Sequence, residues 1–223
     1  MPRENILKND RTLNREMLNK IEQTLQNLCR HYGEQNWWNN ENRIADWVSM
    51  ILIQQTTEKN AVNALQQLED ILTLEQLLIT PVEELQERIR PVGFYKQKSA
   101  YIKHQMSWFA EQGGDLNAFV AIPTETLRKN LLALKGVGQE TADAMLLYLF
   151  DRKVFIADQY ALRLFNRLRL SQSQTYTDLR IECMPLMERI SLKTAQEWHA
   201  VIDEHGKRFR KNPQMDESWI LVP

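Results

Sequence analysis

Hydrophobic residues recur every three or four positions along most of this chain, which is the spacing of residues on one face of an α-helix. Polar and charged residues stand between them, so each helix is expected to bury one face and expose the other. This pattern predicts a series of short amphipathic helices that form a common core. The clearest sets are Leu18, Ile21, Leu25 and Leu28, and then Ile44, Trp47, Val48, Ile51 and Leu52.

Glycine and proline stand where these helices are expected to end. One extended segment, 154–157, is too isolated to nucleate a sheet. The chain contains no repeat of fixed period and no low-complexity linker, so the sequence predicts a compact all-α protein. The predicted helix ends are Gly33, Pro81, Pro91 with Gly93, Gly113 with Gly114, Pro123, Gly136 with Gly138, Pro185, Gly206 and Pro213.

Composition supports the helical fold and argues against several classes of partner. The seven glycines and seven prolines among 223 residues are about half of the usual combined share of roughly 12%. The 28 Lys and Arg residues nearly balance the 29 Asp and Glu residues, for a net charge of -1, which argues against a nucleic-acid binder that relies on a basic tail. The polar N-terminus and the lack of a run of roughly 18 to 20 apolar residues predict neither a signal peptide nor a membrane span.

The two cysteines, Cys29 and Cys183, lie far apart and lack the spacing of metal ligands. They therefore support neither a disulfide framework nor a cysteine-bound metal or cluster. A reducing, cytoplasmic location fits this cysteine usage best.

The strongest functional motif is the segment LKGVGQETA at 134–142, between helices predicted at 124–133 and 141–150. Gly136 and Gly138 permit positive φ and let another backbone pass close by. The amides that open the second helix lie at the positive end of its dipole, an arrangement that binds phosphate. An ordinary αα-hairpin with a glycine cap explains the local pattern equally well.

This hairpin belongs to an ordered series of five motifs. They are Gln54-Gln55-Thr56, the segment IRPVGFYKQKSA at 89–100, the hairpin itself, Asp158 directly after 154–157, and His205-Gly206. Over residues 35–212 the series resembles the helix-hairpin-helix DNA glycosylases of the endonuclease III type. Five matches in order are more specific than any one of them.

The resemblance implies two helical lobes with an active site in the cleft between them. The first would be a helical barrel at 36–152 that contains the hairpin at about 124–150, and the second would combine 1–35 with 153–223. Such enzymes flip a damaged nucleotide out of the duplex and break its N-glycosidic bond. Asp158 would stabilise the cationic sugar and position the attacking water. The simpler interpretation of Asp158 is a helix N-cap worth about 1 kcal/mol, and the two roles are compatible.

Two departures separate this chain from the lyase branch of that family. The lyases have a lysine where this chain has Glu140, and a carboxylate cannot form a Schiff base, so lyase activity is not expected. The lyases also follow their His-Gly with four cysteines for a [4Fe-4S] cluster, whereas this chain has none there, so no iron-sulfur cluster and no other cofactor is expected. The family suggests only a monovalent cation at the hairpin carbonyls. The sequence most resembles the monofunctional alkylbase (3-methyladenine) branch.

Three further features resemble that branch. Trp37 and Trp38 match its paired tryptophans at the base pocket, where an indole face attracts a cationic purine by roughly 0.5 to 2 kcal/mol; the alternative is that they fasten the loop to the core. Lys207 matches a lysine that lies by the glutamate in the branch and can be carbamylated; the alternative is a solvated lysine. Gln54 stands where the family fills the gap left by the flipped nucleotide; the alternative is a polar helix end.

Contacts with DNA phosphates are expected at the hairpin, and two basic groups are further candidates. Such basic groups are also typical of solvated surfaces. The hairpin residues are Gly136, Val137, Gly138, Gln139 and Thr141, and the basic residues are Arg88, Arg90, Lys96, Lys98 and Lys103, with a second group at 207–211.

The sequence therefore predicts a monofunctional base-excision DNA glycosylase that releases alkylated purines such as 3-methyladenine from double-stranded DNA. We expect a monomer without membrane association, in the cytoplasm and on the nucleoid when it is bound to DNA. Two alternatives remain. One is a mismatch glycosylase of the same fold that acts on adenine, uracil or thymine, and the other is a non-catalytic protein that binds damaged DNA.

Overall fold

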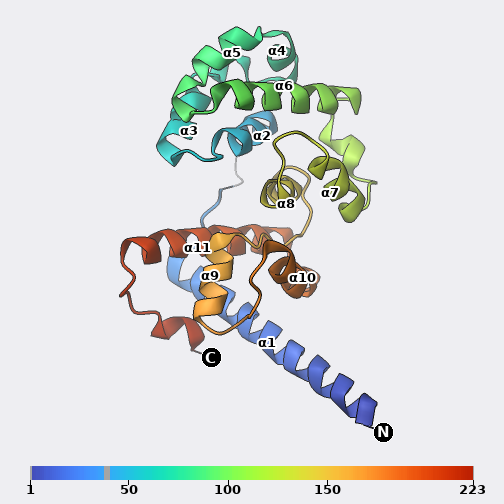
Figure 1. Ribbon diagram of the computed structural model, residues 1–223, viewed down its shortest axis with the longest axis vertical. Coiled ribbons are helices and arrows are strands. Elements are labelled where there is room, and N and C mark those ends of the chain that lie inside the picture. The colour runs from blue at the N-terminus through green and yellow to red at the C-terminus, as the bar shows by residue number, and fades with distance from the viewer. Residues whose placement is uncertain (1, 38–40, 223) are drawn as a thin grey trace. The chain divides into compact units, whose positions relative to one another are not determined.

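A computed structural model describes residues 2–37 and 41–222, apart from the side chains of residues 2–14. Every regular element in these residues is an α-helix or a short 3-10 helix (Figure 1), which confirms the predicted all-α class. The chain divides into two compact units, of which unit 1 combines Met1–Trp38 with Lys153–Pro223 and unit 2 is Asn39–Arg152. None of the described helices is both long and apolar enough to span a membrane.

Unit 2 is a helical domain in which the long helix α6 lies beside α4 and α5, and α2 lies beside α3, α6 and α8 (Figure 1). Its α-helices are α2 (Arg43–Leu52), α3 (Glu58–Gln66), α4 (Leu74–Ile79), α5 (Val82–Arg88), α6 (Tyr95–Glu111), α7 (Thr124–Leu132) and α8 (Gln139–Tyr148). Its 3-10 helices are η1 (Glu69–Ile71), η2 (Arg90–Val92) and η3 (Leu116–Phe119).

The indole of Trp47 lies in the core of unit 2 and is fully buried. Its ring packs at 5.1 Å from Phe109 and 5.9 Å from Phe150, measured between ring centroids. A buried indole N–H needs an acceptor, and Trp47 Nε1 donates to Gln105 Oε1 at 2.8 Å. The amide nitrogen of Gln105 donates in turn to the carbonyl of Lys135 at 3.0 Å. This glutamine therefore links the core to the hairpin between α7 and α8.

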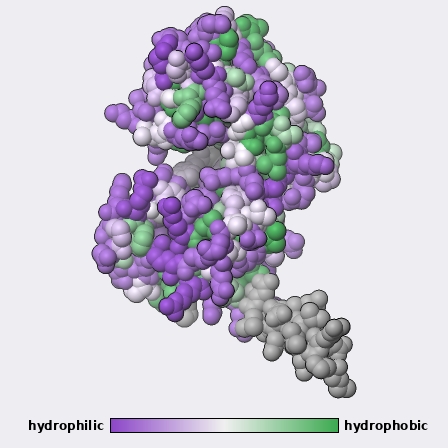
Figure 2. Space-filling view, viewed as in Figure 1, coloured by the Kyte–Doolittle hydropathy of each residue, from purple (hydrophilic) through white to green (hydrophobic). Residues whose placement is uncertain are grey.

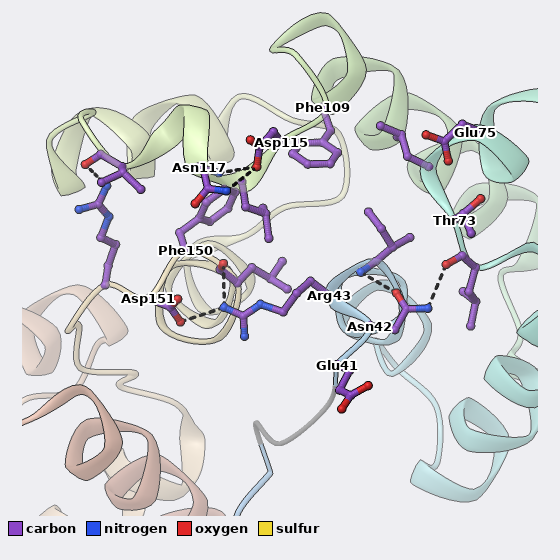
Figure 3. Close-up of a pocket in the computed structure, with 18 residues that line it drawn as sticks. Glu41, Asn42, Arg43, Thr73, Glu75, Phe109, Asp115, Asn117, Phe150 and Asp151 are labelled. Carbon is purple, nitrogen blue, oxygen red and sulfur yellow. Dashed lines mark hydrogen bonds and ion pairs between the residues drawn. The ribbon is translucent and has the colours of Figure 1, made fainter.

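The beginning of α2 is determined by Asn42. Its side-chain oxygen accepts hydrogen bonds from the amides of Ile44 and Ala45, at 3.1 and 3.0 Å, as an N-cap does. Its side-chain nitrogen donates to the carbonyl of Leu72 at 3.0 Å (Figure 3), which ties the helix to the loop after η1. The face predicted to be buried is confirmed at Trp47, Val48, Ile51 and Leu52, whereas Ile44 is only half-buried.

Unit 1 contains α1 (Pro2–Tyr32), α9 (Gln159–Arg167), α10 (Tyr176–Met187), α11 (Leu192–Lys211) and the 3-10 helix η4 (Ser218–Leu221). Helix α11 lies beside α1 and α9 (Figure 1). The predicted apolar face of α1 is buried at Leu18, Ile21, Leu25 and Leu28. The opposite faces of the helices are polar, and the face of the molecule seen in Figure 2 is accordingly mostly hydrophilic.

A buried polar group holds unit 1 together around His205 of α11, whose side chain is fully buried. Its Nδ1 lies 2.8 Å from Tyr32 Oη, and its Nε2 lies 2.7 Å from Glu217 Oε1. Arg167 donates to both oxygens of Glu217, at 2.6 and 2.7 Å. Burial alone would raise the pKa of Glu217, but the hydrogen bonds from Arg167 and His205 and the positive charge of Arg167 hold it below its usual value. The group therefore connects α1, α9, α11 and the segment before η4.

Three expectations about the helices were wrong. Helix α1 is not short, since it spans 31 residues. Helix α10 continues through Pro185, which lies in its last turn and removes only a backbone donor near the helix end, while the next two residues, Leu186 and Met187, are buried. Helix α11 also continues through Gly206, where a Cβ would lie 2.2 Å from the ring of Tyr160. Gly206 therefore permits close packing of α9 on α11 rather than ending a helix.

Candidate active site and helix-hairpin-helix

Asp158 lies where the extended segment 154–157 meets α9. The segment itself is buried, so it can place the following residue precisely within unit 1. Asp158 is 7% exposed, and its Oδ1 accepts a hydrogen bond from the amide of Ala161 at 2.8 Å. The residue is thus the N-cap of α9, which confirms the structural role predicted for it. A carboxylate that is held by a cap and almost fully buried is also suited to stabilise a positive charge beside it.

A histidine beside Asp158 was not predicted from the sequence. Nε2 of His199, on α11, lies 4.0 Å from Oδ2 of Asp158. The ring of Trp37 meets the ring of His199 edge-on, with 5.9 Å between centroids. His199 therefore lies against both Asp158 and Trp37, which are 121 positions apart in the sequence. The sequence signal for this histidine is the spacing of four between residues 199, 203 and 207, which places three polar side chains on one face of a helix.

The loop that carries Trp37 is held by a buried carboxylate. Glu197 of α11 is 6% exposed and accepts hydrogen bonds from the amides of Gln35, at 2.9 Å, and Asn36, at 3.4 Å. Asn36 has φ of +54°, which turns the chain just before Trp37. The side chain of Trp37 is 43% exposed, so its ring is accessible as well as fixed. Trp38 lies outside the described residues.

Lys207 lies about two turns further along α11 than His199, and its side chain also contacts Trp37. Its Nζ pairs with Asp203 Oδ2 at 2.7 Å and lies 5.5 Å from the ring centroid of Trp37. The structure thus brings together three of the predicted site residues, Asp158, Trp37 and Lys207, within unit 1. Glu140 belongs to unit 2, where it is exposed in the first turn of α8.

The imidazole of His199 is expected to be uncharged at neutral pH. Burial, and then the positive charge of Lys207, lowers the pKa of His199 from 6.5 to about 4. The unfolded chain therefore binds more protons than the folded chain between these two values, and stability must fall as the pH falls through this range.

We expect this titration to be visible in unfolding experiments. Lowering the pH from 7 to 4.5 should cost the wild-type protein on the order of 2 to 3 kcal/mol of unfolding free energy through His199, and His199→Gln should remove that contribution. Urea unfolding at the two pH values measures the difference. Equal pH dependence of the two proteins would mean that His199 is not held neutral by the fold.

The hairpin has the predicted helix-hairpin-helix form in unit 2. Helix α7 ends at Leu132 and α8 begins at Gln139. Gly136 has φ of +83°, and a Cβ there would lie 2.3 Å from the ring of Tyr101. Gly138 is the N-cap of α8 and offers no side-chain acceptor to the first amides of the helix, as a helix end that receives an anion requires. The side chain of Val137 is 8% exposed, so this residue can offer only its backbone.

Gln54 lies beside the hairpin. Its side-chain nitrogen donates to the carbonyl of Gly136 at 3.0 Å and lies 3.5 Å from Oγ1 of Thr141. The structure thus brings together Gln54, Gly136 and Thr141 from the predicted DNA-contact set. Because the Gly136 oxygen already accepts this hydrogen bond, a monovalent cation would share that oxygen with Gln54. A cation at this site stays a prediction.

Most of the first basic group proves to be structural. Arg88 pairs with Asp70 and Glu84, and Arg90 pairs with Glu87. The side chains of Lys98 and Lys103 donate to backbone carbonyls. Only Lys96 of this group has no such described contact. Four of these five candidate phosphate contacts therefore have partners within the fold.

Lys98 is the most buried of these cations, at 3% exposure. Its Nζ donates to the carbonyl of Leu52 at 2.8 Å and to that of Val92 at 3.1 Å, and burial lowers its pKa. It thereby joins the turn that contains Gln54 to the turn that contains Phe94, a residue with φ of +48° and 60% exposure. The sequence offered no sign of this role.

Neither cysteine is part of the candidate site. Burial raises the pKa of Cys29 to about 11 and that of Cys183 well above its usual value, so neither is a thiolate at neutral pH.

A cavity of about 910 Å³ in unit 2 contains none of the predicted site residues (Figure 3). One of its charged side chains, Arg43, binds Asp151 at 2.9 Å. In the described residues no group of three or more His, Cys, Asp and Glu is arranged to hold a metal.

An all-helical fold with a glycine hairpin and a buried aspartate at a helix N-terminus defines a helix-hairpin-helix protein. The family profile of the HhH-GPD superfamily base excision DNA repair proteins matches residues 48–189. The chain belongs to this superfamily, and with it to the DNA glycosylases.

Individual relatives agree with this assignment. The chain is 37% identical to a Methanocaldococcus jannaschii protein provisionally named a DNA repair glycosylase, over 86% of this chain and 90% of that protein. The fold is similar to that of H. pylori 3-methyladenine DNA glycosylase bound to 1,N6-ethenoadenine, with a TM-score of 0.70, 22% identity, and coverage of 90% of this chain and 99% of the other. It is equally similar to endonuclease III in a non-covalent complex with DNA, with a TM-score of 0.70, 19% identity, and 90% of each chain covered.

Proposed function

We propose that this protein is a monofunctional DNA glycosylase that hydrolyses the N-glycosidic bond of alkylated purines, 3-methyladenine among them, in double-stranded DNA. One observation carries the proposal. Asp158 is a buried carboxylate at a helix N-terminus, and Trp37 and Lys207 lie in the same part of unit 1. A flipped base needs an aromatic surface, and its sugar needs a nearby negative charge.

In the proposed reaction the bond between C1′ of the flipped nucleotide and the base nitrogen breaks, and its electron pair leaves with the base. The carboxylate of Asp158 stabilises the positive charge that develops on the sugar. Water then adds to C1′, and its proton passes to Asp158 and on to solvent. The products are a free base and an abasic site in an uncut strand.

The hydrolytic outcome depends on the residue at position 140. The lyase branch uses a lysine there as nucleophile, and the carboxylate of Glu140 cannot form the Schiff base. We therefore propose that water is the only nucleophile and that no covalent intermediate forms.

The proposed base pocket includes Trp37, Trp38 and Lys207. A cationic purine on the indole face would meet the ammonium of Lys207, which lies 5.5 Å from the Trp37 ring. Asp203, paired with Lys207 at 2.7 Å, compensates that charge. The attraction between the indole and a cationic base, roughly 0.5 to 2 kcal/mol, is then not opposed by a net positive charge.

We propose that the hairpin of unit 2 binds the DNA backbone through the amides of Gly138, Gln139 and Thr141 while Gln54 lies beside it. Amides at a helix N-terminus attract phosphate without any formal charge. A chain with a net charge of -1 can therefore bind DNA, and we propose that it does so as a monomer.

The reaction is tested by incubating the protein with methylated duplex DNA, ethenoadenine duplex, and duplexes with mismatched adenine, uracil or thymine. Mass spectrometry of the released bases should show alkylated purines. Release only from the mismatched duplexes would support the mismatch glycosylase instead, and binding without release of any base would support the non-catalytic alternative.

Borohydride trapping tests the monofunctional mechanism. The wild-type protein should form no covalent adduct with DNA that contains an abasic site, because it lacks the amine. Glu140→Lys is the matched variant, since it restores the residue of the lyase branch and should give a trapped adduct. A trapped adduct with the wild-type protein would show that another amine acts as nucleophile.

A further inference from the structure

One face of α11 carries three polar residues, His199, Asp203 and Lys207, at intervals of four positions, so they form a single stripe along the helix. Each end of the stripe contacts the candidate site. His199 Nε2 lies 4.0 Å from Asp158 Oδ2 and its ring meets the edge of Trp37. Lys207 lies over the same Trp37 ring and is held by Asp203. The imidazole of His199 therefore lies between the carboxylate of Asp158 and the indole of Trp37.

We propose that His199 is a positioning residue for Asp158. Its imidazole fixes the carboxylate of Asp158 and the ring of Trp37 relative to each other, and it adds no charge of its own. The proposal rests on the proposed role of Asp158 in base release. Trp37 is held from a second side by the carboxylate of Glu197 through the backbone of its loop. The contacts with His199 and Glu197 together hold the Trp37 ring and the Asp158 carboxylate in one relative position.

The charge state of His199 matters for this role. Burial and the nearby Lys207 lower the pKa of His199 to about 4, so the imidazole is neutral under ordinary conditions. A protonated imidazole 4.0 Å from Asp158 would compensate the charge that the departing base requires, because an ion pair in a buried site is strong. A neutral imidazole has the shape and the polar nitrogen to position the carboxylate while its negative charge remains available to the sugar.

His205, the fully buried histidine of α11, shows what a purely structural role looks like. His205 uses both ring nitrogens, with Tyr32 Oη and Glu217 Oε1 as partners, at 2.8 and 2.7 Å. These partners hold helices together, and none of them belongs to the candidate site. His199 is instead packed among Asp158, Trp37 and Lys207. The two histidines lie six positions apart on one helix and form a matched pair for mutation.

The test compares His199→Phe, which keeps a ring of similar size but no polar atom, with His199→Gln, whose amide nitrogen can stand where Nε2 stands. Base release is measured under single-turnover conditions with excess enzyme, on whichever duplex of the panel above the wild-type protein cleaves. DNA affinity is measured separately by fluorescence anisotropy, and thermal unfolding checks the fold.

We expect His199→Phe to slow single-turnover release by about tenfold or more while DNA affinity changes by less than about threefold. His199→Gln should recover most of the rate. His205→Gln should lower the melting temperature, but measured well below that temperature it should leave the rate of release near the wild-type value.

Three results would overturn the proposal. They are an unchanged rate in His199→Phe, a rate in His199→Gln no better than in His199→Phe, and a loss of rate in His205→Gln that equals the loss in His199→Phe. Failure of the proposed function is distinguishable from these results. If the wild-type protein cleaves only mismatched duplexes, the alkylpurine specificity fails while the role of His199 is still measured, and if it cleaves none, both proposals are wrong.

Discussion

Replacing Asp158 with Asn should slow base release by at least about a hundredfold, because the amide keeps the shape of the carboxylate but not its charge. Asn is as good an N-cap as Asp, so α9 should keep its first turn and the protein its stability. Affinity for DNA should change by less than about threefold, since the hairpin lies in unit 2. Single-turnover release and anisotropy measure the two effects separately.

Asp115 offers the matched control. It is an exposed N-cap of η3 in unit 2, and its side chain accepts from the amide of Asn117. Asp115→Asn makes the same chemical change at a cap that has no proposed part in the reaction, and we expect a rate near that of the wild-type protein. Release by Asp158→Asn at the wild-type rate would contradict the proposed mechanism and leave Asp158 with its capping role alone.

The second large effect is expected at the hairpin, where Gly136→Ala should lower the unfolding free energy by about 2 to 4 kcal/mol. The added Cβ would meet the Tyr101 ring at 2.3 Å, and alanine is strained at φ of +83°. DNA affinity should fall as well, measured where the variant is still folded, because the amides that receive the phosphate would move. Urea unfolding and anisotropy record the two changes.

The neighbouring glycine provides the comparison. A Cβ on Gly138 would meet no atom within 4 Å, and its φ of -88° is ordinary for alanine. Gly138→Ala should therefore cost less than about 1 kcal/mol, mainly as a poorer N-cap. Adding Tyr101→Ala to Gly136→Ala should recover part of the loss by removing the collision but not the strain. Equal losses of unfolding free energy in Gly136→Ala and Gly138→Ala would show that the close approach of Tyr101 does not restrict position 136.

Features that depend on neighbouring residues could be predicted from the sequence. The apolar faces at Leu18 to Leu28 and Trp47 to Leu52 follow from helical periodicity, and the hairpin follows from two glycines between two such segments. Asp158 could be placed at a helix N-terminus because a short apolar run precedes it and an amphipathic helix follows. The errors at Pro185 and Gly206 have the opposite cause, since burial of Leu186 and Met187 and the ring of Tyr160 override the local signal.

The hydrogen-bond partners of the buried polar residues could not be predicted in this way. Lys98 was a candidate for a phosphate contact, and the structure shows it donating to the carbonyls of Leu52 and Val92. Glu197 accepts from the amide of Gln35, 162 positions away, and nothing near it in the sequence indicates this. A polar side chain in a core must find a partner, but which partner it finds depends on how distant helices pack.

The sequence by itself determined the helical class, the hairpin and the aspartate at the start of α9, because periodicity, positive φ at glycine and helix capping act over a few residues. Only the tertiary structure decided that His199 stands between Asp158 and Trp37, that Asp203 holds Lys207, and that four of the five candidate cations have partners within the fold. Charge and hydrogen-bonding capacity are present in the sequence, but their use depends on distances between residues that only packing brings together.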